Sequence, residues 1–314
     1  MSKILVIGAK GQIGSELVPA LRERYGWENV VSSDIKPSAE KNYMILDATK
    51  KDAIEAIVAE HEIDTIYNLA SLISAAGEEN PLLARDLNLG SLFNVLDLAR
   101  EYQIKVFWPS SIAAFGKTTP KTVAQHTITE PIETFYGATK VAGELFCANY
   151  HRKFGVDVRS LRYPGIISYA QLPQGGTTDY ASWMIHAAVT NGTFDCFLKE
   201  DTLLPLMYMD DCVRATIELM EQDRANLKIR TSYNLSGFSC TPKKLEQEIR
   251  KHFPEFQVTY TPDHHQAIAD NWPGYILDDE ARQDWGWTPA FDLKKMTKAM
   301  IAGLRKKNGI KILQ

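Results

Sequence analysis

The first half of the chain alternates between two hydrophobic periods. Short apolar runs, of the kind buried in parallel strands, occupy residues 3–7, 30–34, 43–46, 64–68, 104–109 and 156–162. Between them, apolar residues recur at helical spacing near 13–21, 51–60, 81–102 and 135–153. Regular alternation of strands and helices is typical of a parallel sheet with crossover helices. We therefore predict an α/β fold built on a Rossmann-type doubly wound parallel sheet.

The pattern changes after Pro164. A segment rich in Gly, Thr and Pro is followed by shorter elements, which we place near 194–198, 210–222, 241–252 and 257–260. In open α/β sheets, ligands bind outside the carboxyl ends of the strands, and these later segments can cover that edge. We predict a Rossmann domain over residues 1–168. Residues 169–314 are expected to form mainly a smaller C-terminal substrate-binding lobe, with some segments returning to the Rossmann body.

Composition narrows the classes of partner. The chain has 314 residues, with 35 basic and 39 acidic side chains, and this near-neutral balance contains no basic stripe or polybasic anchor. No apolar run approaches the length of a membrane span, and the chain enters a strand without a targeting segment. We expect a cytoplasmic protein with no nucleic-acid or membrane partner.

No metal site is expected from the cysteines and histidines. The four cysteines are far apart and form no C-x-x-C pair, so we interpret them as reduced thiols: Cys147, Cys196, Cys212 and Cys240. His264 and His265 are adjacent, and we expect their side chains to diverge. Zinc sites need several ligands at suitable spacing, which the sequence does not offer.

A glycine-rich turn follows the first strand directly. Gly8, Gly11 and Gly14 have the spacing G-x-x-G-x-x-G and open the helix that begins near Ile13. Such glycines allow a tight turn and close approach of the backbone to a pyrophosphate, while the helix N-terminus offers unpaired N–H groups. Together with the backbone at Gln12, this turn predicts a dinucleotide-binding site in the Rossmann domain.

Asp34 ends the second strand, twenty residues after Gly14. A carboxylate at this position accepts hydrogen bonds from both hydroxyls of the adenosine ribose, and it would repel a 2′-phosphate. The acid therefore favours NAD over NADP, although the neighbouring Lys36 weakens that exclusion. The alternative is that Asp34 is an ordinary aspartate in the turn that ends the strand.

Other candidate cofactor contacts lie after the remaining strands. Asp47 is a candidate on the adenine side, the segment ending the fourth strand would line the pyrophosphate and ribose, and the segment after the sixth would pass beneath the nicotinamide. For Tyr163, plain core packing is an equal alternative. These candidates are Asp47, Ala48, Leu69, Ala70, Ser71, Asn88, Tyr163, Pro164 and Ile166.

Tyr136 and Lys140 are the candidate catalytic pair. Four residues apart on a helix, they share one face, and an ammonium near a phenol lowers the pKa of the phenol toward the working pH. A phenolate so formed can take a proton from an alcohol. Ser110 or Ser111, at the end of the fifth strand, could hold the substrate oxygen against Tyr136, and Ser111 is the preferred candidate. For both serines, a hydroxyl that satisfies loop backbone is the alternative.

Several strings give the chain a family resemblance. Residues 110–116, 136–145, 160–168, 175–181 and 204–211 resemble the extended short-chain dehydrogenase/reductase superfamily and, within it, the L-threonine 3-dehydrogenases. The first three also resemble nucleotide-sugar epimerases, and the last two are more specific. The resemblance implies oxidation of L-threonine to L-2-amino-3-oxobutanoate with NAD and without zinc. It also implies that Lys140 binds the nicotinamide ribose.

The resemblance extends to the substrate and to partners. A small zwitterion needs donors for its carboxylate and an acceptor for its ammonium, and the candidates are Ser74, Ser111, Tyr136, Thr177, Thr178, Asp179 and Trp272. Helix capping by Thr178 and Asp179 and ordinary packing of Trp272 are the alternatives. Relatives pair the helices near 81–102 and 135–153 in a four-helix interface, so we expect a homodimer. Burial of the same apolar faces within one subunit is the alternative. Functional coupling to a 2-amino-3-oxobutanoate CoA lyase is a further partner suggested by the product.

Two other functions are compatible with part of this pattern. A nucleotide-sugar epimerase or dehydratase uses the same serine, tyrosine and lysine, but it must clamp a second diphosphate with basic residues of the C-terminal lobe. That lobe is short in this chain, and its lysines lie mainly on the surfaces of predicted helices. A non-catalytic cofactor-sensing protein could dispense with the catalytic residues, which this chain retains.

Overall fold

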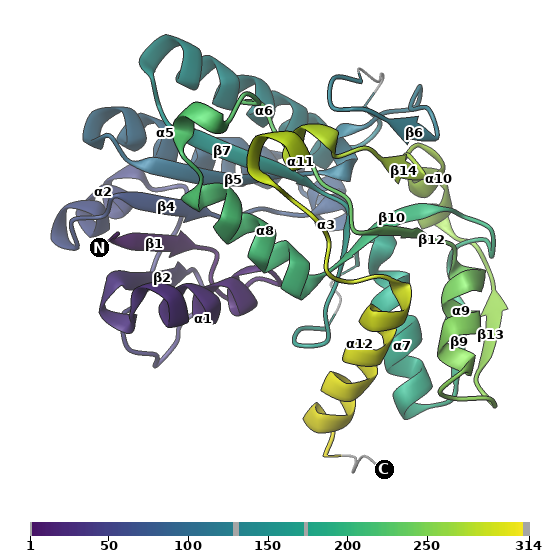
Figure 1. The fold of residues 1–314 in the computed structure, drawn as a ribbon. Coiled ribbons are helices and arrows are strands. Elements are labelled where there is room, and N and C mark those ends of the chain that lie inside the picture. Colours follow the sequence, from purple (N-terminus) through teal and green to yellow (C-terminus); the bar gives the residue numbers. More distant parts are fainter. Residues whose placement is uncertain (1, 128–131, 173–174, 310–314) are drawn as a thin grey trace.

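A seven-stranded parallel sheet forms the centre of the larger part of the molecule (Figure 1). The computed structural model describes residues 2–127, 132–172 and 175–309, without the side chains of 74–76. The strand order is β11-β7-β5-β4-β1-β2-β3, and every pairing is parallel. The chain thus builds outward from β1 to one edge and then returns to build the other, which confirms the predicted doubly wound fold. The strands are β1 Ile4–Ile7, β2 Val30–Asp34, β3 Tyr43–Ile45, β4 Thr65–Asn68, β5 Lys105–Ser111, β7 Val158–Tyr163 and β11 Tyr233–Asn234.

Helices cover both faces of this sheet because successive side chains of each strand point to opposite sides. Ile4 and Val6 of β1 belong to one apolar cluster, together with buried side chains of α1, α8 and α11. Leu5 and Ile7 belong to a second cluster, with buried side chains of α2, α5 and α6. These helices are α1 Gly14–Tyr25, α2 Lys51–Glu60, α5 Ser91–Tyr102, α6 Phe135–Phe154, α8 Met209–Glu221 and α11 Asp279–Trp285.

The helix predicted over residues 81–102 contains a π-helical turn. α3 (Ser74–Glu79) and α4 (Pro81–Arg85) precede a π-helical turn, η2 (Asp86–Gly90), and only then does α5 begin. The wider turn carries Asn88, which is 1% exposed and uses its side-chain amide in hydrogen bonds to neighbouring segments. The helix predicted over residues 81–102 is therefore confirmed, with a π-helical turn inside it that places a buried polar side chain.

The smaller lobe contains three short sheets. β12 (Phe238–Cys240), β10 (Leu204–Tyr208) and β8 (Gly165–Ile167) form the first, β9 (Thr193–Cys196) pairs with β13 (Gln257–Tyr260), and β6 (Thr122–Val123) pairs with β14 (Tyr275–Ile276). Its helices are α7 Tyr180–Thr190, α9 Pro242–Arg250, α10 His264–Asp270 and α12 Leu293–Lys307. Short 3-10 turns occur at η1 Trp27–Asn29, η3 Ile112–Ala114, η4 Thr177–Asp179 and η5 Arg224–Asn226.

The two parts of the chain exchange segments. α8 and α11 pack on the main sheet and β11 joins its edge, although all three come after residue 168. In the other direction, β6 of the first part pairs with β14 of the last. Parts of the C-terminal half therefore belong to the Rossmann body, and the boundary at residue 168 stays a prediction.

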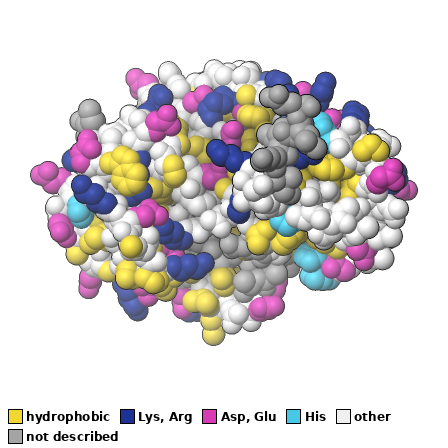
Figure 2. Space-filling model, turned by 90° about the horizontal axis from the view of Figure 1, so that it is seen from below, with side chains coloured by type: hydrophobic (Ala, Val, Ile, Leu, Met, Phe, Trp, Pro, Cys, Tyr) yellow, Lys and Arg dark blue, Asp and Glu magenta, His cyan; other side chains and the backbone are white. Residues whose placement is uncertain are grey.

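The surface mixes charges of both signs. On the face drawn in Figure 2, acidic, basic and hydrophobic side chains are interspersed. All four cysteines are buried and free. Within the described residues, no helix combines the length and the apolar character needed to cross a bilayer.

Candidate active site

A cavity of about 240 Å³ lies at the carboxyl ends of the main strands and is closed on one side by segments of the smaller lobe. It brings together the glycine turn, the end of β5, the first turns of α6 and the start of η4. The predicted site residues that line it are Gly8, Gly11, Gln12, Ile13, Gly14, Leu69, Ser71, Ser111, Tyr136, Lys140, Tyr163, Pro164, Ile166, Thr177, Thr178, Asp179 and Trp272. Asp34, Asp47, Ala48, Ala70 and Asn88 lie outside this lining. The side chain of Ser74 lies outside the described part of the structure, so its predicted role has no geometry here.

The glycine turn leaves no room for side chains. Gly8 has φ +87°, and a Cβ there would lie 2.9 Å from the backbone nitrogen of Ala70. A Cβ on Gly14 would lie 2.3 Å from the carbonyl oxygen of Gly8. α1 begins at Gly14, and Ile13 before it provides no side-chain cap. The N–H groups of Ser15, Glu16 and Leu17 donate to the carbonyls of Gly11 and Ile13, so a pyrophosphate would meet the backbone of the glycine turn that precedes them.

Asp34 reaches back to the same turn. Its Oδ2 accepts a hydrogen bond from the backbone N–H of Lys10 (2.9 Å), and its Oδ1 accepts one from Lys36 (3.1 Å). These contacts fix a carboxylate at the end of β2, beside the glycine turn. This is the position from which a ribose can be bound, and contact with the ribose stays a prediction.

Three other predicted cofactor residues, Asp47, Ala48 and Asn88, form hydrogen bonds with other groups of the protein. Asp47 accepts hydrogen bonds from the backbone and hydroxyl of Thr49, which lower the pKa of its carboxyl. The carbonyl of Ala48 accepts a hydrogen bond from Asn94. Asn88 bonds to Ser71, to both backbone groups of Leu72 and to Thr139. Asn88 therefore orders the loop after β4, and its direct contact with a cofactor stays a prediction.

Tyr136, Lys140 and Ser111 converge on one wall of the cavity. α6 starts at Phe135 because Thr134 caps it, accepting a hydrogen bond from the N–H of Gly137 (3.0 Å). Tyr136 thus lies in the first turn and Lys140 one turn later, with the Lys140 Nζ 5.3 Å from the centre of the Tyr136 ring. Ser111 ends β5 and lines the cavity beside Tyr136, and its side chain opposes the rise in the pKa of that phenol. The three residues predicted to be catalytic are neighbours in space.

Burial dominates the protonation of this pair. It raises the pKa of Tyr136 to about 12, and the side chain of Ser111 opposes that rise. Burial also lowers the pKa of Lys140 to about 7, against the opposing influence of Cys147 and Glu144. The expectation that Lys140 lowers the pKa of Tyr136 is therefore wrong for the protein alone. A buried lysine that gives up its proton near neutrality cannot supply a constant positive charge.

A buried ion pair behind the wall was missed by the sequence analysis. Glu144, one turn beyond Lys140, accepts two hydrogen bonds from Arg162 and one from the Oγ of Ser110. The hydroxyl of Ser110 is thus engaged away from Ser111, which favours Ser111 as the catalytic serine. Other lining residues that were missed are Ile73, Pro109, Ile112, Ala113, Gly165 and Gly176. Gly165 had a detectable signal, because a glycine after Pro164 permits close approach, and a Cβ there would lie 2.5 Å from Thr178.

The smaller lobe contributes polar groups to the cavity. Thr177 is 1% exposed, and its hydroxyl has no hydrogen-bond partner within the described protein. The carboxylate of Asp179 accepts hydrogen bonds from the backbone N–H groups of Gly175 (3.0 Å) and Gly176 (2.6 Å). Asp179 makes no side-chain cap to α7 itself, but it caps the preceding turn η4 through its bond to Gly176, so the capping alternative describes its contacts in this structure. Trp272 is 8% exposed and lines the cavity.

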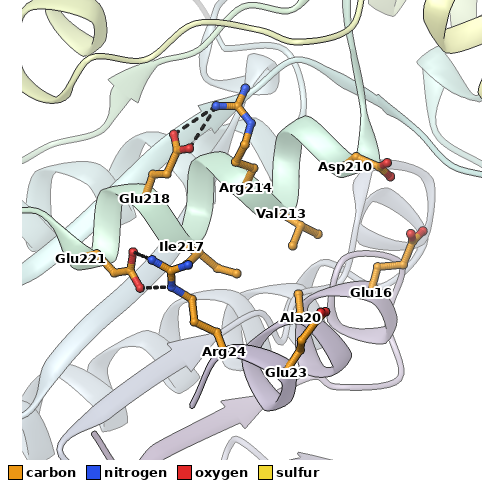
Figure 3. Close-up of a pocket in the computed structure, with 10 residues that line it drawn as sticks. All are labelled: Glu16, Ala20, Glu23, Arg24, Asp210, Val213, Arg214, Ile217, Glu218 and Glu221. Carbon is orange, nitrogen blue, oxygen red and sulfur yellow. Dashed lines mark hydrogen bonds and ion pairs between the residues drawn. The ribbon is translucent and has the colours of Figure 1, made fainter. Parts of the chain in front are cut away.

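A larger hollow of about 930 Å³ lies between α1 and α8 (Figure 3). Both arginines that line it pair with glutamates, Arg24 with Glu221 and Arg214 with Glu218. Glu16 and Asp210 lie together at its other end, and burial raises the pKa of both carboxyls. None of the predicted catalytic or cofactor residues lines it. We therefore place the active site in the smaller cavity, where the chemistry converges.

His264 and His265 do not diverge as expected. Their ring centres lie 4.0 Å apart, and with Asp263 they bring three potential metal-ligand atoms within 4.8 Å of one another. Asp263 accepts hydrogen bonds from the N–H and Nδ1 of His265 (2.8 and 2.7 Å), so it caps α10. A helix N-terminus disfavours a cation. Capping therefore accounts for the cluster.

Comparison with known proteins identifies the family. The chain belongs to the NAD dependent epimerase/dehydratase family, whose model matches residues 4–236. Curated relatives include uncharacterized epimerase/dehydratases from Staphylococcus haemolyticus, 46% identical over 98% of this chain and 99% of the relative, and from Staphylococcus aureus, 44% identical over 99% of each. The family's cofactor is NAD, as the glycine turn and Asp34 predicted.

Solved structures of L-threonine dehydrogenases are similar to this chain over nearly its full length. A partial consensus L-threonine 3-dehydrogenase has a TM-score of 0.94 and 52% identity, with 97% of this chain and 99% of that chain covered. The holo form of a GalE-like L-threonine dehydrogenase from Cupriavidus necator has a TM-score of 0.94 and 51% identity, covering 96% and 99%. The L-threonine 3-dehydrogenase of Trypanosoma brucei has a TM-score of 0.96 and 38% identity, covering 100% of both. The resemblance stated from the sequence strings is confirmed.

Proposed function

We propose that this protein oxidises L-threonine at its 3-hydroxyl to L-2-amino-3-oxobutanoate, with NAD as the hydride acceptor. The observation that carries the proposal is the convergence of Ser111, Tyr136 and Lys140 on a cavity that also contains the glycine turn. The full-length similarity to L-threonine dehydrogenases supports the choice of substrate. The proposed mechanism needs no metal ion.

The protein fits NAD through groups of its own. The backbone of the glycine turn would hold the pyrophosphate, and Asp34 would hold the adenosine ribose. Pro164 and Ile166 line the cavity where the nicotinamide would lie, and Lys140 would bind its ribose. When bound, NAD supplies the electrophilic ring that accepts a hydride. Cofactor contacts of Asp47, Ala48, Leu69, Ala70, Ser71, Asn88 and Tyr163 belong to the same proposal.

The chemical step would rest on three side chains. Tyr136 takes the proton of the substrate hydroxyl as the C3 hydrogen leaves with its electron pair. Ser111 donates to the same oxygen and steadies it as it becomes a carbonyl. Lys140, fixed by its hydrogen bond to the carbonyl of Pro109 (2.8 Å), carries positive charge when protonated and then favours the phenolate.

The polar content of the cavity favours a small substrate over a nucleotide sugar. Among the described lining residues, Lys140 is the only Lys or Arg, whereas a second diphosphate needs several cationic partners. Thr177 supplies a buried hydroxyl that a carboxylate can satisfy. Thr178, Asp179, Trp272 and Ser74 complete the proposed substrate side.

The proposal is tested by product formation from a matched panel. The chelator-treated protein is incubated with NAD and with L-threonine, D-threonine, L-serine or UDP-sugars. NADH formation confined to L-threonine, and unaffected by added zinc, supports the proposal. Epimerised sugar without NADH formation would assign the same catalytic residues to a nucleotide-sugar epimerase.

We also propose that the protein forms a homodimer through α4 and α6. Leu82 and Leu83 of α4 are 68% and 53% exposed, and Leu145 and Phe146 of α6 are 62% and 39% exposed. Exposed apolar side chains on adjacent helices are typical of an association surface. Leu92, Val95 and Leu96, on the same predicted helix, are fully buried within the subunit. The proposed interface is therefore confined to the outer side chains.

A further inference from the structure

Glu144 lies on the same face of α6 as the proposed catalytic pair. Tyr136, Lys140 and Glu144 follow one another at intervals of four residues, so their side chains leave one side of the helix. Glu144 is 4% exposed and does not line the cavity. Burial of a carboxylate is costly unless it is paired and hydrogen-bonded. Its partners therefore indicate what it does.

Arg162 holds Glu144 through two parallel hydrogen bonds. The Nε of Arg162 donates to Oε1 (2.7 Å), and its Nη2 donates to Oε2 (2.6 Å). The remaining nitrogen, Nη1, donates to the carbonyl of Gln125 and to the Oδ1 of Asn234, both at 3.1 Å. This fork geometry is specific in direction as well as strong. The carboxylate is thus fixed relative to β7 and β11.

The last three residues of β5 each contact one member of the α6 face. The carbonyl of Pro109 accepts a hydrogen bond from Lys140 (2.8 Å), and Ser110 donates one to Glu144 (2.5 Å). Ser111 lines the cavity beside Tyr136 and opposes the rise in the pKa of its phenol. Of these three residues of α6, only Glu144 is also held in place by a buried ion pair, the one with Arg162. Any slippage of the strand end along α6 would disturb all three contacts together.

We propose that Glu144, held by Arg162, is a positioning residue that locks the end of β5 against α6 and so sets the placement of Ser111 relative to Tyr136 and Lys140. It acts through Ser110 and touches no reacting group. Its expected effect on turnover rests on the proposed function, whereas its effect on the strand end does not. Misplacement of reacting groups by about 1 Å can cost about 100-fold in rate.

The test compares Glu144→Gln with the wild-type full-length protein. Glutamine keeps the shape and an acceptor for Ser110, but it loses the charged fork with Arg162. We expect kcat with L-threonine to fall about tenfold or more, while KM for L-threonine and the affinity for NAD change by less than about threefold. Amide hydrogen exchange across residues 109–113 should accelerate.

Asp157→Asn is the matched control. Asp157 precedes β7 at the opposite end of the sheet and pairs with Arg159 and Arg230. Its loss should lower the melting temperature and leave kcat and the exchange of residues 109–113 unchanged. Arg162→Lys keeps the charge and loses the fork, so its kcat should lie between those of the wild type and Glu144→Gln. This variant also serves if Glu144→Gln does not fold.

Two results would overturn the inference. One is a folded Glu144→Gln protein with wild-type kcat and unchanged exchange; the other is an equal loss of kcat in Asp157→Asn. If the wild-type protein does not oxidise L-threonine, the proposed function fails by itself. The exchange measurement then still decides whether Glu144 holds the strand end.

Discussion

Lys140 donates a hydrogen bond from its Nζ to the carbonyl oxygen of Pro109, at 2.8 Å, while lying over the ring of Trp108. The bond joins the catalytic helix to the strand that supplies Ser111. It also keeps a lysine in a fully enclosed position, where burial lowers its pKa to about 7. One residue thus links the geometry of the site to its dependence on pH.

The activity should rise with pH. The proposed base is the phenolate of Tyr136, and burial raises the pKa of that phenol to about 12. Below this value, the phenolate fraction increases at most about tenfold for each pH unit. We expect kcat/KM for L-threonine to increase from pH 7 to pH 9, measured by initial NADH formation with the melting temperature followed in parallel. Because Lys140 loses its positive charge over the same range, the rise should be shallower than about tenfold per pH unit. A falling profile in a protein that stays folded would contradict Tyr136 as the base.

Replacement of Lys140 by Met should abolish turnover and raise the melting temperature at pH 7. Because the pKa of Lys140 falls on folding, the unfolded chain binds more protons between pH 7 and about 10.5, so stability rises with pH across that window. A shift of one pKa unit corresponds to about 1.4 kcal/mol of folding free energy. The cost of burying Lys140 therefore exceeds the ~1 kcal/mol that its hydrogen bond to Pro109 contributes, and removing the lysine should stabilise the fold at pH 7.

Thermal unfolding at several pH values checks this. The Met variant should gain less stability than the wild type between pH 7 and pH 9.5. Equal slopes in the two proteins would mean that Lys140 keeps its ordinary pKa in the folded state.

Gly14→Ala should weaken NAD binding strongly. A methyl group at this position would lie 2.3 Å from the carbonyl oxygen of Gly8, so the turn would have to open. Gly90→Ala is the matched control, because a Cβ there meets nothing within 4 Å. Isothermal titration with NAD should give a large loss of affinity for the first variant and none for the second. The control should be neutral or more stable by about 0.5–1 kcal/mol.

Leu145→Glu should convert the proposed dimer to a monomer. Leu145 is 62% exposed on α6, so the new carboxylate would be solvated in a single subunit and buried in the proposed interface. Light scattering after size exclusion gives the mass directly. Leu172→Glu, at a side chain 52% exposed outside α4 and α6, is the control and should leave the mass unchanged. A wild-type protein that is already monomeric would rule out the interface.

The sequence predicted the parts of the site that depend on local patterns. The strands, the glycine turn, Asp34 and the pair Tyr136 and Lys140 follow from short spacings that local geometry imposes. The ion pair of Glu144 with Arg162 did not, because it joins a helix to a strand whose alignment only the folded chain defines. The pKa of Tyr136 was predicted in the wrong direction for the same reason. Burial depends on the tertiary structure. Its effect on the pKa of Tyr136 is larger than that of Lys140, whose own pKa is lowered to about 7.

Two features of the fold could also not be predicted from local sequence patterns. The π-helical turn at 86–90 interrupts an apolar pattern that continues through it, and its Asn88 bonds to the distant Thr139. The pairing of β6 with β14 joins two-residue strands from opposite parts of the chain. Such short strands have no period that a sequence pattern can reveal.

The central claim is that hydride leaves C3 of L-threonine for NAD while Tyr136 takes the hydroxyl proton. The most direct measurement uses L-threonine deuterated at C3, with the reduced nicotinamide analysed by mass spectrometry. The wild-type protein should transfer the deuterium to NADH, and Tyr136→Phe should bind NAD and transfer little or none. Absence of deuterium from the NADH formed by the wild-type protein, or wild-type transfer rates in Tyr136→Phe, would contradict the account.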